Sequence, residues 1–98
     1  KFTSIKISTT FQSRFGPQEW LQPYTDKTLE NLPKEGIKNV LTICPGFSSD
    51  CVETLEEIDI QGRESFLSNG GKNFDLVPCL NDSSDHIELF EKLVKKYI

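Results

Sequence analysis

Acidic side chains recur at helical spacing in the middle of the chain, shortly after an apolar run and a Pro45-Gly46 turn. A helix is predicted from near Ser49 or Asp50 to about Ser68, and at about 100° per residue one of its faces carries a row of acids. These acids are Asp50, Glu53, Glu57 and Glu64. Carboxylates one turn apart can bind a divalent metal ion or accept protons. The solvated face of any surface helix shows the same pattern, and periodicity alone leaves both interpretations open.

Residues 10–24 form a second group with chemical potential, in a segment that Pro17 and Pro23 exclude from regular helix. Its side chains combine aromatic rings with polar groups. They are Phe15, Trp20 and Tyr24, with Gln12, Ser13 and Arg14. Aromatic rings that form a flat apolar surface, with polar side chains beside them, suit a planar, anionic ligand. Alternatively, the aromatic rings fill the core or pack a hinge.

The remaining reactive residue types give weaker indications. Cys44, Cys51 and Cys79 are odd in number and lack Cys-x-x-Cys spacing, so neither a disulfide framework nor a zinc knuckle is predicted. Reduced, partly buried thiols are expected instead. His86, the only histidine, falls in the first turn of the last predicted helix and is expected at the surface, without a role.

The segments that must position these groups alternate between strand and helix. Strands are predicted over residues 4–11, 39–44 and 74–80, and helices over 25–32, 50–68 and 84–97. Short connections in this order favour right-handed crossovers onto one parallel sheet. We therefore predict a single α/β domain over residues 1–98, with a parallel sheet flanked by helices in three layers. Because three strands are few for an independent domain of this class, we expect the sheet to be incomplete and the sequence to be a piece of a longer protein.

Composition narrows the classes of function. The 98 residues are 36% hydrophobic and 27% charged, as in an ordinary globular domain. Fifteen acids against eleven Lys and Arg give a net charge of −4, which repels polyphosphate and argues against nucleic acid as a partner. No apolar stretch approaches the roughly 20 residues of a membrane span. We expect a cytoplasmic protein.

The two chemical segments also resemble known signatures. Residues 11–26, which read FQSRFGPQEWLQPYTD, are similar to the first signature of the ferrochelatase family. Residues 44–58, which read CPGFSSDCVETLEEI, are similar to its second signature. Two long motifs in the same order and spacing make the resemblance specific, and it covers essentially the whole chain. The sequence Pro45-Gly46-Phe47 is similar to that of bacterial members of the family.

The resemblance implies an activity and a set of site residues. Ferrochelatases insert ferrous iron into protoporphyrin IX, the last step of haem biosynthesis, and are lyases. By position, Glu53 matches the active-site glutamate, and Asp50 and Glu57 match acids along the same helix, so the three are predicted to handle metal. On the porphyrin side the predicted residues are Trp20, Gln12, Ser13 and Arg14. Cys51 departs from the pattern, since many members have His there.

The resemblance further implies a Rossmann-like half of a chelatase-like fold, from the C-terminal portion of the enzyme. The family's active-site histidine lies on a Ser-x-His loop in a preceding segment, and His86 is too far along the chain to match it. We therefore expect the 98 residues alone to be inactive. Ferrous iron is a substrate, and neither a cofactor nor an iron–sulfur cluster is expected.

The partners implied are protoporphyrin IX, ferrous iron, the rest of a ferrochelatase chain, and, for the parent enzyme, peripheral contact with the inner membrane. A homodimer is a further arrangement left open. The alternative function is a non-catalytic α/β module that binds a porphyrin, a metal or a protein.

Overall fold

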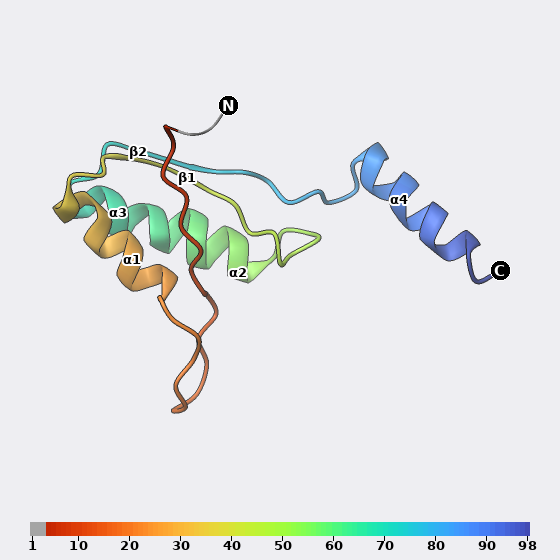
Figure 1. Ribbon diagram of the computed structural model, residues 1–98, viewed down its shortest axis with the longest axis horizontal. Helices are drawn as coiled ribbons and strands as arrows, with labels where there is room; N and C mark the ends of the chain where they lie inside the picture. The colour runs from red at the N-terminus through yellow and green to blue at the C-terminus, as the bar shows by residue number, and fades with distance from the viewer. Residues whose placement is uncertain (1–3) are drawn as a thin grey trace.

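The structure is a computed structural model that describes residues 4–98 (Figure 1). Helix α1 (Thr25–Asn31) continues into a single 3₁₀ segment, η1 (Leu32–Glu35). Pro33 enters the first turn of η1, where its missing N–H costs nothing, and Gly36 ends it with a φ of 92°. The predicted helix over residues 25–32 is confirmed.

Two parallel strands form the sheet. Strand β1 (Asn39–Thr42) pairs with β2 (Asn73–Leu76) in the register that places Val40 opposite Phe74. Val40 and Phe74 face the core, whereas Leu41 points to the other face and is 67% exposed. The α/β class and the parallel pairing of these two predicted strands are confirmed.

The segment between the strands is one continuous helical run with three parts. It consists of α2 (Val52–Thr54), the π-helical segment η2 (Leu55–Gly62) and α3 (Arg63–Ser68). The predicted helix to Ser68 is therefore present, but its middle has the wider i→i+5 turn. Gly62 lies where α1 comes close, since a Cβ built there would be 2.9 Å from Leu29 Cδ1.

A small core lies between the helices and the sheet. Leu29 of α1, Ile58 of η2, Phe66 of α3 and Phe74 of β2 are buried together with Cys44. The rings of Phe66 and Phe74 are 6.0 Å apart at a tilted angle. Figure 1 shows α1, α2 and α3 on the same side of the two strands.

The predicted strand over residues 4–11 is wrong. In the described residues this segment is extended and forms only one isolated bridge, from Phe11 to Tyr24. Ile5 and Ile7 are 56% and 81% exposed, so their alternating pattern has no sheet edge or apolar face to pack on. The described sheet thus has two strands, where three were predicted, and its helices cover one face.

Helix α4 (Ser84–Lys95) confirms the last predicted helix and projects away from the rest of the fold (Figure 1). Its apolar stripe, which includes Phe90, Leu93 and Val94, stays largely exposed. His86 is an exception and corrects the expectation of a surface residue, because it is buried with only 6% of its surface exposed. None of the helices within residues 4–98 has the length and apolar character needed to cross a membrane.

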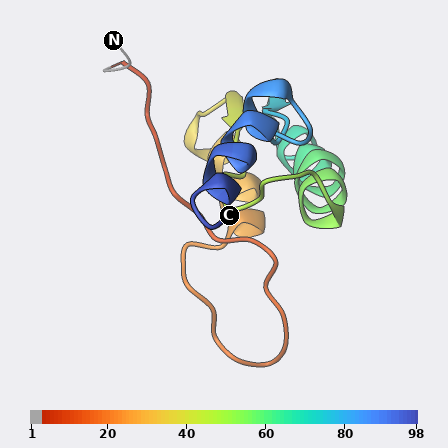
Figure 2. The same cartoon turned by 90° about the vertical axis from the view of Figure 1, so that its right-hand side faces the viewer.

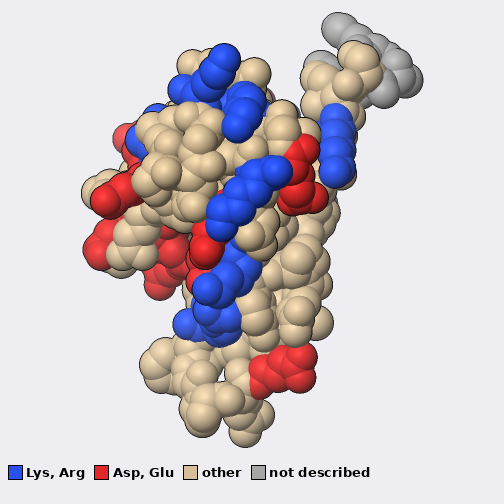
Figure 3. Space-filling view, turned by 90° about the vertical axis from the view of Figure 1, so that its left-hand side faces the viewer, with Lys and Arg blue, Asp and Glu red and all other residues tan. Residues whose placement is uncertain are grey.

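The charged side chains are of mixed sign on the face viewed in Figure 3, where Lys and Arg lie among Asp and Glu. No large surface of one sign is seen there. This distribution agrees with a small net charge of −4.

Candidate functional site

A cavity of about 480 Å³ lies between the segment at residues 11–14 and the helical run that follows β1. This size falls within the usual range for small-molecule sites. Residues from the loop, from α1 and from all three parts of the helical run form its walls. They are Phe11, Gln12, Ser13, Arg14, Tyr24, Thr25, Asp26, Leu29, Val52, Glu53, Glu56, Glu57, Ile58, Gln61, Gly62 and Ser65.

Two acidic residues of the helical run hold the loop in place. Glu57 accepts hydrogen bonds from the Ser13 backbone N–H (2.8 Å) and from the Ser13 hydroxyl (3.1 Å). The side-chain amide of Gln12 donates to the backbone carbonyl of Glu53 at 2.6 Å. Ser13 has a φ of 65°, a left-handed conformation that is uncommon outside glycine. The carboxylate of Glu57 thus stabilises a loop conformation with an intrinsic cost.

Residues 11–24 form a loop, here called the aromatic loop, whose two ends are hydrogen-bonded to each other. Phe11 N–H donates to the Pro23 carbonyl (2.9 Å), and Thr25 N–H donates to the Phe11 carbonyl (3.0 Å). The hydroxyls of Thr10 and Thr25 are also hydrogen-bonded, at 2.7 Å. Between these ends the chain extends as an open loop beyond the helices, as Figure 2 shows.

Arg14 provides positive charge at the wall of the cavity. Its guanidinium donates to Asp26 at 3.1 Å and lies over the Tyr24 ring, 4.1 Å from the centroid. The Arg14 side chain remains 39% exposed, so it keeps donors free toward the cavity. An anionic group of a flat ligand would find a planar donor set here.

Glu53 is an ionised group in the first turn of the helical run. Hydrogen bonds from the Cys51 side chain and from its own backbone N–H lower the pKa of the Glu53 carboxyl below its ordinary value. The residue as a whole is partly exposed and lines the cavity. It is therefore charged at neutral pH and can accept a proton or contact a cation.

Asp50 lies off this cavity, at the start of the helical run. Its Oδ1 accepts from the Thr54 hydroxyl (2.9 Å), and its Oδ2 accepts from the Asn81 side-chain amide (2.9 Å) and the Cys79 N–H (3.2 Å). The hydrogen bonds from Asn81 and Thr54 lower the pKa of the Asp50 carboxyl. Its predicted contact with metal stays a prediction.

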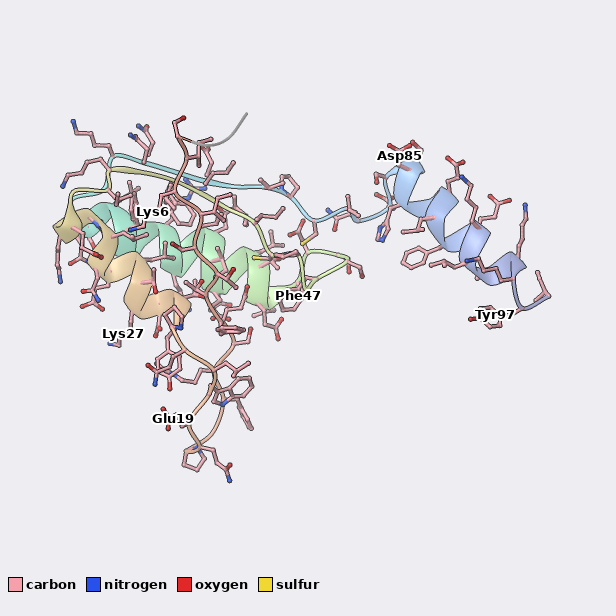
Figure 4. The ribbon with its side chains drawn as sticks, viewed as in Figure 1. Lys6, Glu19, Lys27, Phe47, Asp85 and Tyr97 are labelled. Carbon is pink, nitrogen blue, oxygen red and sulfur yellow. The ribbon has the colours of Figure 1, made fainter. Side chains whose placement is uncertain are left out.

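Trp20 also lies away from the carboxylates. It lines a separate hollow of about 630 Å³ in the outer loop, with Phe15, Gln18, Glu19 and Leu21. Its indole N–H donates to the Phe15 carbonyl at 2.7 Å. Figure 4 shows the labelled Glu19 on this outer loop, far from the helical run. The predicted contact of Trp20 with a porphyrin edge stays a prediction.

The family model described as ferrochelatase matches residues 1–98. The ferrochelatase of Vibrio vulnificus is 62% identical over 89 residues, which cover 91% of this chain and 28% of that protein. Those of Proteus mirabilis and Rhizobium etli are 57% and 56% identical, each over 94 residues. The chain belongs to the ferrochelatase family. It spans about 28% of the length of the curated relatives it matches, and no solved structure matches it.

In this ferrochelatase-family chain, five of the seven predicted site residues meet at one cavity. These five are Gln12, Ser13, Arg14, Glu53 and Glu57. The sequence reasoning missed Glu56 and Gln61, which also line the cavity, and placed Glu64 on the same face, although Glu64 does not line it. The π turn of η2 changes the angle between successive side chains, so a periodicity of 100° fails beyond Leu55.

The thiols of Cys44 and Cys79 are protonated at neutral pH. Burial, with the Asp50 charge as the next cause, raises the pKa of Cys44. Burial and the hydrogen bond with Asp50 raise the pKa of Cys79 to about 11. Across residues 4–98 no three His, Cys, Asp or Glu side chains come together as a metal site.

Proposed function

We propose that this chain forms the carboxylate side of a site that inserts ferrous iron into protoporphyrin IX to give protohaem, a lyase reaction at the end of haem biosynthesis. One observation carries the proposal: in a member of the ferrochelatase family, Glu53 and Glu57 line the same cavity as Gln12, Ser13 and Arg14. The protoporphyrin and the iron are the substrates in this proposal.

The reaction needs groups that take up protons and release a metal ion from water. Insertion of Fe²⁺ removes two protons from pyrrole nitrogens, and Fe²⁺ accepts oxygen and nitrogen ligands. Glu53 is the candidate base because its carboxylate is ionised and lines the cavity. Both oxygens of Glu57 already accept hydrogen bonds from Ser13, which favours a role in holding the loop against the helix.

The loop residues have separate tasks in this proposal. Gln12 and Ser13 attach the wall to the helical run, and the guanidinium of Arg14 is free to pair with an anionic side group of the porphyrin. Trp20 is proposed to contact the edge of the ring from the outer loop.

A hybrid enzyme tests this function. The matching segment of the Vibrio vulnificus ferrochelatase is replaced by this chain, which is 62% identical to it over 89 residues. We expect the hybrid to form haem from Fe²⁺ and protoporphyrin, and Glu53→Gln to lower kcat by roughly 10²- to 10⁴-fold. Glu64→Gln is the matched control, since this residue is on the same helical run but off the cavity. Equal rates for Glu53→Gln and the parent hybrid would refute the assignment.

The family resemblance and the exposed apolar side chains of the outer loop support a proposal for the compartment and the membrane contact of the site. We propose a cytoplasmic site whose parent enzyme touches the inner membrane peripherally, supported by the exposed Phe15 and Leu21 of the outer loop, which are 83% and 68% exposed. Sedimentation of the hybrid with anionic vesicles, compared with a Phe15→Ser and Leu21→Ser variant, tests the contact. We also propose that the cysteines of this chain hold no iron–sulfur cluster, since within residues 4–98 no three potential ligand side chains come together.

A further inference from the structure

Asn81 joins two segments that are far apart in sequence. It follows β2, in a left-handed conformation with a φ of 51°, and its backbone N–H donates to the Ser48 carbonyl at 3.0 Å. Its side chain makes two hydrogen bonds with Asp50, accepting one and donating the other. The Asn81 Oδ1 accepts from the Asp50 backbone N–H (2.8 Å), and the Asn81 Nδ2 donates to the Asp50 carboxylate (2.9 Å).

Asp50 is in turn hydrogen-bonded to the first turn of the helical run. Its other carboxylate oxygen accepts from the hydroxyl of Thr54, a side chain with no exposed surface. The same Thr54 oxygen accepts from the Cys51 N–H at 3.0 Å, which satisfies a donor ahead of the helix. Glu53 lies within this turn, between Cys51 and Thr54.

His86 supports Asn81 from the other side. The His86 Nδ1 lies 2.5 Å from the Asn81 carbonyl oxygen and donates to it, since a carbonyl only accepts. The imidazole is buried and packs on the Phe90 ring at 4.5 Å. The start of α4 therefore fixes the backbone of Asn81, whose side chain fixes Asp50.

We propose that Asn81 and Asp50 form a latch that positions the first turn of α2, and with it the carboxylate of Glu53, so that Asp50 is a positioning residue and not a metal ligand. The inference rests on the function proposed above and deepens it. Every oxygen of the Asp50 carboxylate is already occupied by protein donors, and the group lies off the cavity. A shift of about 1 Å in a reacting group can cost on the order of 10²-fold in rate.

A charge exchange within the hybrid enzyme tests the latch. Asn81→Asp places two carboxylates against each other, and we expect kcat to fall on the order of 10- to 100-fold while KM for iron stays within about twofold. Asp50→Asn keeps an acceptor toward Asn81 and is expected to be milder. Combining Asp50→Asn with Asn81→Asp exchanges the two groups, restores both hydrogen bonds, and should recover about tenfold of the loss.

The controls separate positioning from metal binding and from misfolding. Asn73→Asp makes the same change at an exposed asparagine of β2 that pairs with Asn39, and it should leave kcat unaltered. In the 98-residue chain, Asn81→Asp should accelerate amide hydrogen exchange at Asp50 and Cys79, and the exchanged pair should slow it again at Asp50. A raised KM for iron in Asp50→Asn, or no recovery in the double variant, would overturn the latch. A hybrid insensitive to Glu53→Gln would overturn the proposed function instead.

Discussion

Glu57 and Ser13 show how single residues build the wall of the cavity. Ser13 occupies a left-handed conformation that its side chain does not favour, and two hydrogen bonds to one carboxylate hold it there. Hydrogen bonds to charged groups are worth about 1.5–3 kcal/mol, comparable with the cost of such a backbone conformation. The free energy of these hydrogen bonds is thus close to the cost of the Ser13 conformation, and one substitution can make the attachment of the loop unfavourable.

Removal of the Glu57 carboxylate should therefore release the loop. In Glu57→Ala we expect the Ser13 amide to exchange with solvent roughly 10- to 100-fold faster, with the helical run itself unchanged. Glu56→Ala is the control, because Glu56 lines the same cavity but accepts from Gln61. Hydrogen exchange followed by NMR makes the comparison, and equal protection of Ser13 in the two variants would contradict the prediction.

Asp50 makes stability depend on pH in the acid range. Its folded-state pKa is lowered by the Asn81 and Thr54 hydrogen bonds, so the unfolded chain binds the proton more tightly. The stabilisation is complete above the unfolded value of about 3.9 and is lost as pH falls through the lower folded value. Urea unfolding between pH 6 and 2 should show a fall that is shallower in Asp50→Asn. An identical pH dependence in the two proteins would refute this.

The sequence predicts the composition of the site better than its connections. Gln12, Ser13 and Arg14 are adjacent to one another, and Glu53 and Glu57 are one turn apart, so local spacing suffices to group them. The partner of Asp50 is Asn81, which is far along the chain, and no local pattern indicates such a pair. His86 was expected at the surface for the same reason, since its burial depends on Phe90 and the Asn81 carbonyl.

At the scale of elements, the turn between α3 and β2 is tightly packed against the core. A Cβ at Gly71 would lie 2.2 Å from Phe66 Cε2, and Phe66 has no exposed surface. Side chains of the core cannot move aside without disturbing Phe74, against which Phe66 packs.

Gly71→Ala should for this reason destabilise the fold by about 1–3 kcal/mol, the usual cost of overpacking. Gly46→Ala is the matched control, because a Cβ there meets nothing within 4 Å. Urea unfolding of both variants gives the free energies. If the two glycine variants unfold at the same urea concentration, the packing argument is wrong.

The local spacing of apolar residues predicts most of the helices and strands, but it fails for the π-helical segment and for residues 4–11. The apolar spacing of α1 and α4 and the continuous apolar residues of β1 are strong local signals, and all three elements are present. The π turn of η2 has no such signal, because it depends on how Ile58 and Gly62 fit against Leu29 and Phe74. The alternation of Ile5 and Ile7 is typical of a strand, but a strand needs a neighbour, which this segment lacks within the described residues.

For the whole molecule, the carboxylates and the loop meet at one cavity, which we propose to be only part of a catalytic site. The family resemblance places a histidine on a Ser-x-His loop across from the glutamate, and the only histidine here, His86, is bound to Asn81 near the start of α4. No histidine is thus among the described residues that line the cavity, where Glu53 has only other carboxylates, such as Glu57, beside it.

We accordingly expect the 98-residue chain alone to give no steady formation of haem from Fe²⁺ and protoporphyrin, at concentrations where the hybrid enzyme turns over. Porphyrin binding without turnover is still expected, and quenching of Trp20, the only tryptophan, reports it. Absorbance at the haem bands measures the product. Sustained haem formation by the isolated chain would show that the carboxylate side suffices.

The closure of the aromatic loop at Phe11, Pro23 and Thr25 has an evolutionary consequence. Since the two ends of this loop are hydrogen-bonded to each other, we expect the length and sequence of residues 15–22 to be able to vary without altering the spacing of Thr10 and Thr25. If residues 15–22 contact the porphyrin as proposed, selection for a differently substituted ring can act on them while the helical run with Glu53 and Glu57 stays unchanged.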